Sequence, residues 1–379
     1  MPGLRFDLRD TPPEAPALRA ELRAFLAEAG KGWPPRVRAY SWMGFDREFS
    51  REVGARGWIG MTWPEAYGGG GRTALERYVV LEEMLAVGAP VAAHWIGDRQ
   101  SGPLLLRLGT EEQRREFLPR ICRGELAFAI GLSEPDSGSD LASLRTKAER
   151  ADGGWKINGR KVWTTNAHQC DFMIALLRTS PSPDPKHKHQ GLSQFLVDLR
   201  SSGIAIRPIL DLAGEEGFNE ITFDDVFVPD SLLVGKEGEG WKQATAELAF
   251  ERAGPERYLS SFPLLAAALD DLRGEPAAPE AVGRLLARAG TLRQMSLAVA
   301  GMLQDGVTPE REAALVKDAG NDYEQALPER LRDLMDPART PPEVREMLAD
   351  TTMVARSYSL RGGTREILRG IIARQLGLR

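Results

Sequence analysis

Two short segments, far apart in the chain, contain residue types suited to acid–base chemistry at carbon. They read Leu248-Ala249-Phe250-Glu251-Arg252 and Arg361-Gly362-Gly363-Thr364-Arg365-Glu366-Ile367. A carboxylate can remove a proton from carbon when a dry pocket raises its pKa toward the working pH. Glu251 ends a helical run, and Pro255 has no N–H to donate to the Glu251 carbonyl, so the helix must bend or stop there. Such a helix end is suited to line a cavity, which makes Glu251 a candidate general base.

Other interpretations of the first segment stay open on the residues alone. Glu247 lies four residues earlier on the same helical face and is a rival for the role of base. Glu251 and Arg252 are also compatible with an ordinary solvated charged pair on a helix surface. The segment by itself therefore does not decide between a catalytic and a structural carboxylate.

A second pair of motifs indicates a binding site. A strand expected over residues 126–132 runs into Ser133-Glu134-Pro135-Asp136-Ser137-Gly138-Ser139-Asp140. Pro135 and Gly138 allow backbone amides and small hydroxyl groups to turn toward an anionic ligand. An ordinary turn rich in serine and aspartate is the alternative. The stretch Trp163-Thr164-Thr165-Asn166 follows and strengthens the case for a ligand site.

The order and spacing of these motifs resemble the acyl-CoA dehydrogenase family, flavoenzymes that desaturate CoA thioesters, over nearly the whole chain. The resemblance implies FAD as the cofactor, with the Trp163 ring packed on the flavin and Thr165 near its N5 edge. Ser139 is implied to reach the CoA group as well. The cofactor-binding residues implied in this way are Ile130, Leu132, Ser133, Ser139, Trp163, Thr164, Thr165, Thr364 and Glu366.

The resemblance also favours Glu251 as the base. One family variant places the carboxylate directly before Gly-Thr in the last motif, and the other places it on the helix that bears Glu-Arg. Here Gly362 stands before Gly363-Thr364, so the chain resembles the second variant. Glu251 would then take the α proton of an acyl-CoA while FAD N5 accepts the β hydride, which gives a trans-2-enoyl-CoA. The implied substrate-binding residues are Ser139, Phe250, Arg252, Gly362 and Gly363, with a glycine amide holding the thioester carbonyl.

Two stretches depart from the family pattern. Family members usually carry Arg-x-x-Phe-Gly and a glycine-rich stretch that grip the adenine half of FAD in a neighbouring subunit, but residues 272–279 and 333–341 contain neither. Because a dinucleotide is held mainly through its phosphates and ribose hydroxyls, we expect a heteromer, such as a heterotetramer, in which a related chain supplies these groups. An electron-transfer flavoprotein is the implied electron acceptor. A non-catalytic, cofactor-completing subunit and a flavin oxidase or monooxygenase are the alternatives.

Composition narrows the class of protein. The 379 residues are 42% hydrophobic and carry a formal net charge of -5, which predicts a soluble globular protein without a nucleic-acid partner. No signal peptide or membrane-spanning run is visible, so we expect a cytoplasmic location. Two cysteines without a CxxC pair and four histidines without ligand spacing give no support for a disulfide framework or a metal site.

The elements that must position these motifs change type twice along the chain. Apolar residues at helical spacing, such as Leu18, Leu22, Phe25 and Leu26, predict a helical domain over residues 1–125. Short β-rich runs predict a middle β-barrel or sandwich domain over 126–235, with a type I′ hairpin turn at Asn158-Gly159. Helical spacing returns over 236–379 and predicts a four-helix bundle. The predicted fold class is therefore a multidomain α+β protein.

Overall fold

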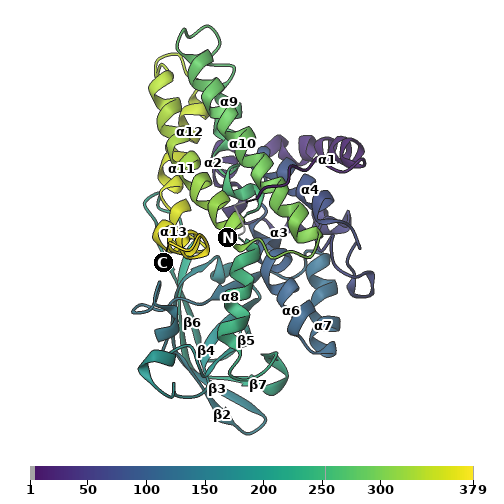
Figure 1. Cartoon of the computed structure of the whole chain (residues 1–379), viewed down its shortest axis with the longest axis vertical. Helices are drawn as coiled ribbons and strands as arrows, with labels where there is room; N and C mark the ends of the chain where they lie inside the picture. Colours follow the sequence, from purple (N-terminus) through teal and green to yellow (C-terminus); the bar gives the residue numbers. More distant parts are fainter. Residues whose placement is uncertain (1–4, 252, 379) are drawn as a thin grey trace. The chain divides into compact units, whose positions relative to one another are not determined.

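The computed structural model describes residues 5–251 and 253–378, without the side chains of Pro185 and of residues 246–251. The chain forms two compact units, whose elements are labelled in Figure 1. The first unit comprises Met1–Gly44, Arg72–Ala92 and Ala249–Arg379, and the second comprises Phe45–Gly71 and Ala93–Leu248. Along the described residues, none of the helices combines the length and the apolar character needed to cross a bilayer.

A β-sheet forms the centre of the second unit. Its strands follow the order β6-β7-β3-β2-β4-β5-β8, and β1 pairs with β4 in parallel. The strands are β1 Phe128–Gly131, β2 Lys147–Ala151, β3 Gly154–Thr165, β4 Phe172–Arg178, β5 Leu192–Asp198, β6 Ile204–Ile209, β7 Phe218–Pro229 and β8 Leu233–Val234. Alternate side chains from these strands, among them Trp155 and Phe195, pack into a buried core on one face.

The second unit also contains helices, one of which is tied to the sheet by hydrogen bonds of a glutamine side chain. They are α3 Arg47–Ala55, α6 Gly102–Leu108 and α7 Glu111–Cys122, together with most of α5 Ala92–Ile96 and of α8 Gly240–Glu251. Thr110 and Gln113 form a capping box at the start of α7. The Gln113 amide also donates to the carbonyls of Ser231 and Leu233 at 2.7 and 2.9 Å, which anchors the start of α7 beside strand β8.

The first unit is helical. Its helices are α1 Ala15–Ala29, α2 Pro35–Tyr40, α4 Ala74–Ala86, α9 Phe262–Ala268, α10 Ala278–Gln304, α11 Glu310–Leu334, α12 Pro342–Ala355 and α13 Arg365–Gln375. Helices α10 and α11 run side by side, and Arg288 of α10 forms an ion pair with Asp322 of α11 at 2.9 Å (Figure 1). The apolar stripe predicted from Leu18 to Leu26 is the buried face of α1.

The predicted fold class is confirmed, because helices, then a sheet, then helices follow one another along the chain. The predicted domain boundaries at residues 125 and 235 stay predictions. The predicted hairpin turn at Asn158-Gly159 is wrong: the β2–β3 turn lies at Asp152-Gly153, and Asn158-Gly159 lies inside β3.

Tertiary contacts explain why Asn158 and Gly159 do not form a turn. The Asn158 side chain bonds to Asp225 of β7, donating to its carboxylate and accepting from its backbone N–H. A Cβ at Gly159 would lie 2.8 Å from the backbone of Thr146, so only glycine allows this close approach between chain segments. The dipeptide therefore lies within β3 opposite a bulge of β7, because β3 advances two residues from Ile157 to Gly159 while β7 advances three from Val226 to Phe223.

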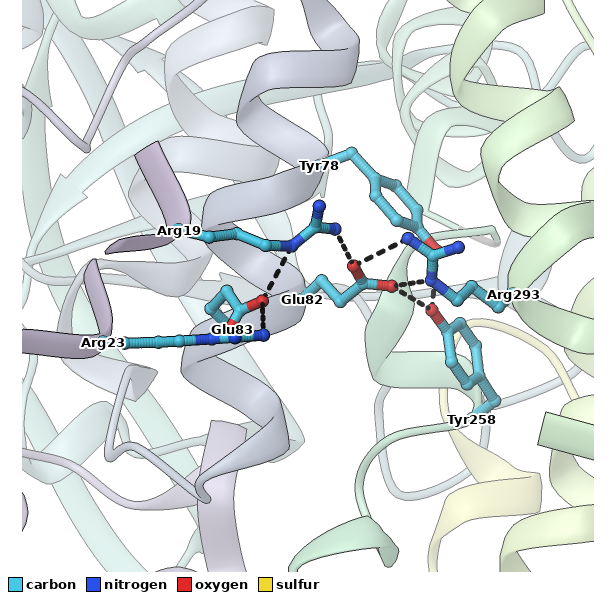
Figure 2. Close-up of polar contacts among 7 residues, drawn as sticks. All are labelled: Arg19, Arg23, Tyr78, Glu82, Glu83, Tyr258 and Arg293. Atoms are coloured by element: carbon cyan, nitrogen blue, oxygen red, sulfur yellow. Dashed lines mark hydrogen bonds and ion pairs between the residues drawn. The ribbon is translucent and has the colours of Figure 1, made fainter. Parts of the chain in front are cut away.

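A nearly buried charged cluster joins distant parts of the first unit. Figure 2 shows Arg19 of α1 and Arg293 of α10 reaching the Glu82 carboxylate of α4 from opposite sides, at 2.7 and 2.6 Å. Tyr258, just after the short turn that follows α8, donates to Glu82 and shares a 2.6 Å hydrogen bond with Tyr78. The Glu82 side chain is only 11% exposed. One carboxylate thus connects α1 and α4 with α10 and with the segment beyond α8.

We expect Glu82→Gln to lower the free energy of unfolding by about 2–4 kcal/mol, because two poorly hydrated guanidinium groups would lose their shared counter-charge. Urea denaturation of the variant and the parent protein measures the change. Glu280→Gln is the matched control, since Glu280 pairs with Arg284 on a helix surface where both side chains are 77% exposed. The control should cost less than about 0.5 kcal/mol, and an equal effect of both substitutions would contradict the role assigned to Glu82.

Candidate functional site

The Ser133–Asp140 motif forms a closed turn directly after β1. Backbone hydrogen bonds run both ways between Glu134 and Ser137, at 2.9 and 3.0 Å, and the Ser137 hydroxyl donates to the Asp140 carbonyl at 2.7 Å. The Val162 N–H donates to the Ser133 carbonyl at 2.9 Å. The turn is therefore fastened to strand β3 next to Trp163, so the structure brings the two motifs together.

Trp163 has two unusual properties for a large aromatic residue. Its backbone has a φ of +59°, in the left-handed region that costs a residue with a side chain about 1–2 kcal/mol. Its side chain is 59% exposed. The ring of Phe218 lies edge-on to it, and the two ring centroids are 6.1 Å apart. A shift in the β3–β7 register between Lys161 and Thr164 produces this local geometry. Backbone strain at a largely exposed aromatic residue indicates a functional role for the ring.

A buried ion pair lies beneath the turn. The Lys161 ammonium contacts the Glu134 carboxylate at 2.9 Å, and the two side chains are 0% and 8% exposed. Burial lowers the pKa of Lys161 to about 8, although Glu134 acts in the opposite direction. Burial would raise the Glu134 pKa, but the charge and the hydrogen bonds of Lys161 and the neighbouring donors lower it overall. Both groups are therefore charged at neutral pH.

The turn and Trp163 fit a planar aromatic cofactor such as the isoalloxazine of FAD. Trp163 offers an open ring face for stacking. Among the described residues, no atom lies within 4 Å of a Cβ built on Gly138, so a ligand can approach the backbone of the turn. Ile130 is half-buried near the end of β1, and Leu132 follows the strand. Thr164 is buried and Thr165 half-buried beside the tryptophan.

The double-glycine segment, the other motif expected to bind substrate, belongs to the first unit. Gly362 and Gly363 have φ values of +61° and +101°, a backbone shape that side chains disfavour. The Arg361 guanidinium lies over the rings of Trp42 and Tyr358, with distances to the ring centroids of 4.4 and 5.3 Å.

The chain beyond the double glycine is also held in place. The Lys317 ammonium of α11, fully buried, donates to the Gly363 carbonyl at 2.7 Å. Thr364 caps helix α13 by accepting a hydrogen bond from the Ile367 N–H. Glu366 lies exposed in the first turn of α13, where hydrogen bonds from its own backbone and from Thr364 lower its pKa. The double-glycine turn is thus fixed on both sides by cationic side chains.

The predicted base is only partly visible. Helix α8 ends at Glu251, as expected from Pro255, which begins a short 3-10 turn. The side chains of Glu251, of its rival Glu247 and of Phe250 lie outside the described residues, as does Arg252 altogether. Their predicted roles in proton removal and substrate binding therefore stay predictions.

The two stretches that lack the family's adenine-binding motifs lie against each other within the first unit. The Thr340 hydroxyl donates to the Asp271 carboxylate at 2.6 Å, and Arg339 donates to Glu275 at 3.2 Å. These polar side chains satisfy one another. The region that departs from the family pattern is consequently a folded feature of this chain.

Sequence reasoning did not single out Lys161, Glu134, Lys317 or Arg361. A signal existed for Lys161, because two-residue alternation along β3 places it on the same face as the buried Trp155 and Ile157. A lysine on the inward face of a strand predicts a buried counter-charge. No comparable periodic signal connects Lys317 with Gly363, since helix and turn meet only in the tertiary structure.

The strain at Trp163 leads to a comparison of two substitutions. Trp163→Gly should be more stable than Trp163→Ala by about 1 kcal/mol, because glycine adopts positive φ without penalty. Thermal denaturation of both variants measures the difference. At Lys156, an exposed position of the same strand without positive φ, the glycine variant should instead be the less stable of the pair. If the glycine variant were less stable than the alanine variant at Trp163 as well as at Lys156, the backbone at Trp163 would carry no strain.

Comparison with known proteins agrees with the geometry. The family descriptions "Acyl-CoA dehydrogenase, N-terminal domain" and "Acyl-CoA dehydrogenase, middle domain" match residues 12–125 and 129–226. The acyl-CoA dehydrogenase IpdE1 of Mycobacterium tuberculosis is 35% identical, over 95% of this chain and 97% of its own length. The chain spans between 50% and 64% of the length of other curated acyl-CoA dehydrogenases that it matches.

Solved structures give the same result. The Tcur3481-Tcur3483 steroid ACAD has a TM-score of 0.86 at 29% identity, covering 98% of each chain. The ChsE4-ChsE5 complex from Mycobacterium tuberculosis has a TM-score of 0.83 at 30% identity, covering 99% of this chain and 100% of the other. Together with the turn, the exposed tryptophan and the double glycine, these similarities show that the chain belongs to the acyl-CoA dehydrogenase family of oxidoreductases.

Proposed function

We propose that this protein uses FAD to convert an acyl-CoA thioester into a trans-2-enoyl-CoA. The observation that carries the proposal is the presentation of the Trp163 ring, which is exposed at the expense of backbone strain, beside a turn of small hydroxyl residues. Membership of the acyl-CoA dehydrogenase family supports it.

FAD, when bound, would accept the hydride that leaves the β carbon of the substrate. Trp163 would stack on the flavin, Thr164 and Thr165 would contact its edge, and Ser133 would bind polar groups of the cofactor. Ile130 and Leu132 would supply apolar contacts from the end of β1. Thr364 and Glu366, at the start of α13, would provide further contacts to FAD.

Glu251 would remove the α proton, so that its carboxylate becomes a carboxylic acid as the C–H electron pair moves into the new double bond. A backbone N–H of Gly362 or Gly363 would donate to the thioester carbonyl and stabilise its enolate-like charge. The fixed turn supports this role, because Arg361 and Lys317 hold both of its sides. Ser139, Phe250 and Arg252 would complete the substrate contacts.

A bulky, steroid-derived acyl-CoA is the substrate class that we favour. The support is the similarity to a protein described as a steroid ACAD, which covers nearly the full length of both chains. Electrons would pass from the reduced flavin to an electron-transfer flavoprotein.

We further propose that the functional assembly is a heteromer with a second acyl-CoA dehydrogenase-like chain. Residues 272–279 and 333–341 lack the adenine-binding motifs and are joined to each other by the hydrogen bond from Arg339 to Glu275. Similarity to the ChsE4-ChsE5 complex supports a mixed assembly. A cofactor-completing subunit without chemistry of its own is the alternative, as is a flavin oxidase or monooxygenase, which would consume oxygen during turnover.

Glu251→Gln should abolish bleaching of the flavin by substrate while FAD stays bound, because glutamine keeps the shape of glutamate but cannot accept the proton. Stopped-flow absorbance of the oxidised flavin, with a panel of acyl-CoA thioesters that includes steroid-derived ones, measures this. Glu247→Gln is the matched control and should bleach like the parent protein. Loss of bleaching in the control alone would transfer the role of base to Glu247.

The heteromer leads to a prediction about cofactor content. Purified alone, the chain should contain well under one FAD per polypeptide, and co-expression with the second chain from a neighbouring gene should restore full occupancy. The ratio of flavin absorbance to protein mass gives the occupancy, and light scattering gives the assembly size. Full occupancy in the chain expressed alone would contradict a heteromer built around a shared cofactor.

A further inference from the structure

The buried ion pair beneath the Ser133 turn lies between two groups of candidate flavin residues. Leu132 and Ser133 immediately precede Glu134 on the chain, and Trp163 follows Lys161 by two residues on β3. The pair is therefore the point at which the strand–turn motif and the tryptophan motif are joined in the interior of the second unit.

Both side chains hold backbone groups as well as each other. The Lys161 ammonium donates to the Leu132 carbonyl at 3.0 Å, in addition to the Glu134 carboxylate. That carboxylate also accepts from the N–H groups of Arg145 and Thr146, at 2.6 and 2.9 Å. The pair thus fastens the end of β1, the turn and the chain leading into β2 to a single point on β3.

Global stability alone does not account for an ion pair in this place. Two apolar side chains of similar volume commonly stabilise a protein as well as a buried ion pair does, or better, because the charges must be desolvated. The charged side chains also orient the backbone around them, because each of their hydrogen bonds fixes the orientation of one carbonyl or N–H group. Here those groups belong to the segments that carry Leu132, Ser133 and Trp163.

We propose that the Lys161–Glu134 pair positions the flavin site by locking the Ser133 turn to strand β3, so that FAD affinity depends on the pair more than the stability of the fold does. The proposal rests on the FAD-dependent function proposed above. Lys161 and Glu134 are positioning residues in this view, because they act through the backbone that carries the cofactor contacts.

Two variants separate positioning from simple stabilisation. Lys161→Met leaves the Glu134 carboxylate buried without its counter-charge, so it should lower both the melting temperature and FAD affinity. The double variant Lys161→Met, Glu134→Gln removes both charges and should recover most of the melting temperature. It cannot restore the donor to the Leu132 carbonyl, and one amide oxygen replaces a carboxylate that accepts from two N–H groups.

The double variant should therefore still bind FAD at least about tenfold more weakly than the parent protein, which corresponds to a lost hydrogen bond in a buried site. Equilibrium dialysis of FAD against the protein, with its partner chain where one is needed for binding, measures the affinity. Lys156→Met is the matched control, because Lys156 lies on the same strand in an exposed ion pair with Asp225. The control should bind FAD like the parent protein.

Hydrogen exchange provides a readout that does not need the cofactor. Backbone amides of residues 133–140 should exchange faster in the double variant than in the parent protein, while those of β4 and β5 should be unchanged. Parent-like FAD affinity or parent-like exchange over 133–140 in the double variant would overturn the proposal. A parent protein that takes up no FAD, alone or with its partner, would overturn the FAD-dependent function instead, and the exchange measurement would still decide the role of the pair.

Discussion

A charged group removed from water needs a partner of opposite charge close by, because desolvation of a lone carboxylate or ammonium costs several kcal/mol. In the first unit, the Glu82 carboxylate is paired with Arg19 and Arg293, which come from helices far apart in the sequence. In the second unit, Lys161 and Glu134 satisfy each other under the candidate flavin turn. The need to pair buried charge thus fixes which distant segments must meet.

For function, the consequence is that the backbone is rigid at the candidate site segments, where a small displacement would change the geometry of the reacting groups. Catalysis by proton and hydride transfer needs the reacting groups held in a narrow range of geometries. Trp163 keeps an unfavourable backbone conformation because the bulged strand and the turn beside it are both anchored. The Gly362-Gly363 turn is likewise held by the stacked Arg361 and by the buried Lys317. Each of these two segments therefore consists of a strained or glycine-dependent backbone supported by a cation.

The departures from the family pattern concern the other end of the cofactor. The motifs that we propose to contact the flavin are present, whereas the stretches expected to bind adenine are replaced by loops that bond to each other through Asp271, Glu275, Arg339 and Thr340. A chain of this kind can supply the chemistry of a shared site while relying on another chain for part of the cofactor affinity. Such a division of catalysis and cofactor binding between two chains is what the proposed heteromer requires.

Much of the fold was predictable from the sequence by itself. The apolar stripe of α1, the capping box of α7, strands β4 to β7 and the end of α8 at Glu251 all follow from spacing and from local residue chemistry, because each depends on neighbours within a few positions. The motifs around Ser133, Trp163 and Gly362 were likewise sufficient to indicate the family. These features are local, so the sequence carries them directly.

Only the tertiary structure decided the remainder. Asn158-Gly159 has the composition of a hairpin turn, yet contacts with Thr146, just before β2, and with Asp225 of β7 hold it inside strand β3. The partners of Lys161, Lys317 and Arg361 could not be predicted from the sequence either. A buried charged group contacts partners that are close in space, and its residue type does not say where along the chain those partners lie. Short-range propensity therefore specified the elements and the motifs of this protein, and long-range pairing of desolvated polar groups specified how those motifs are held.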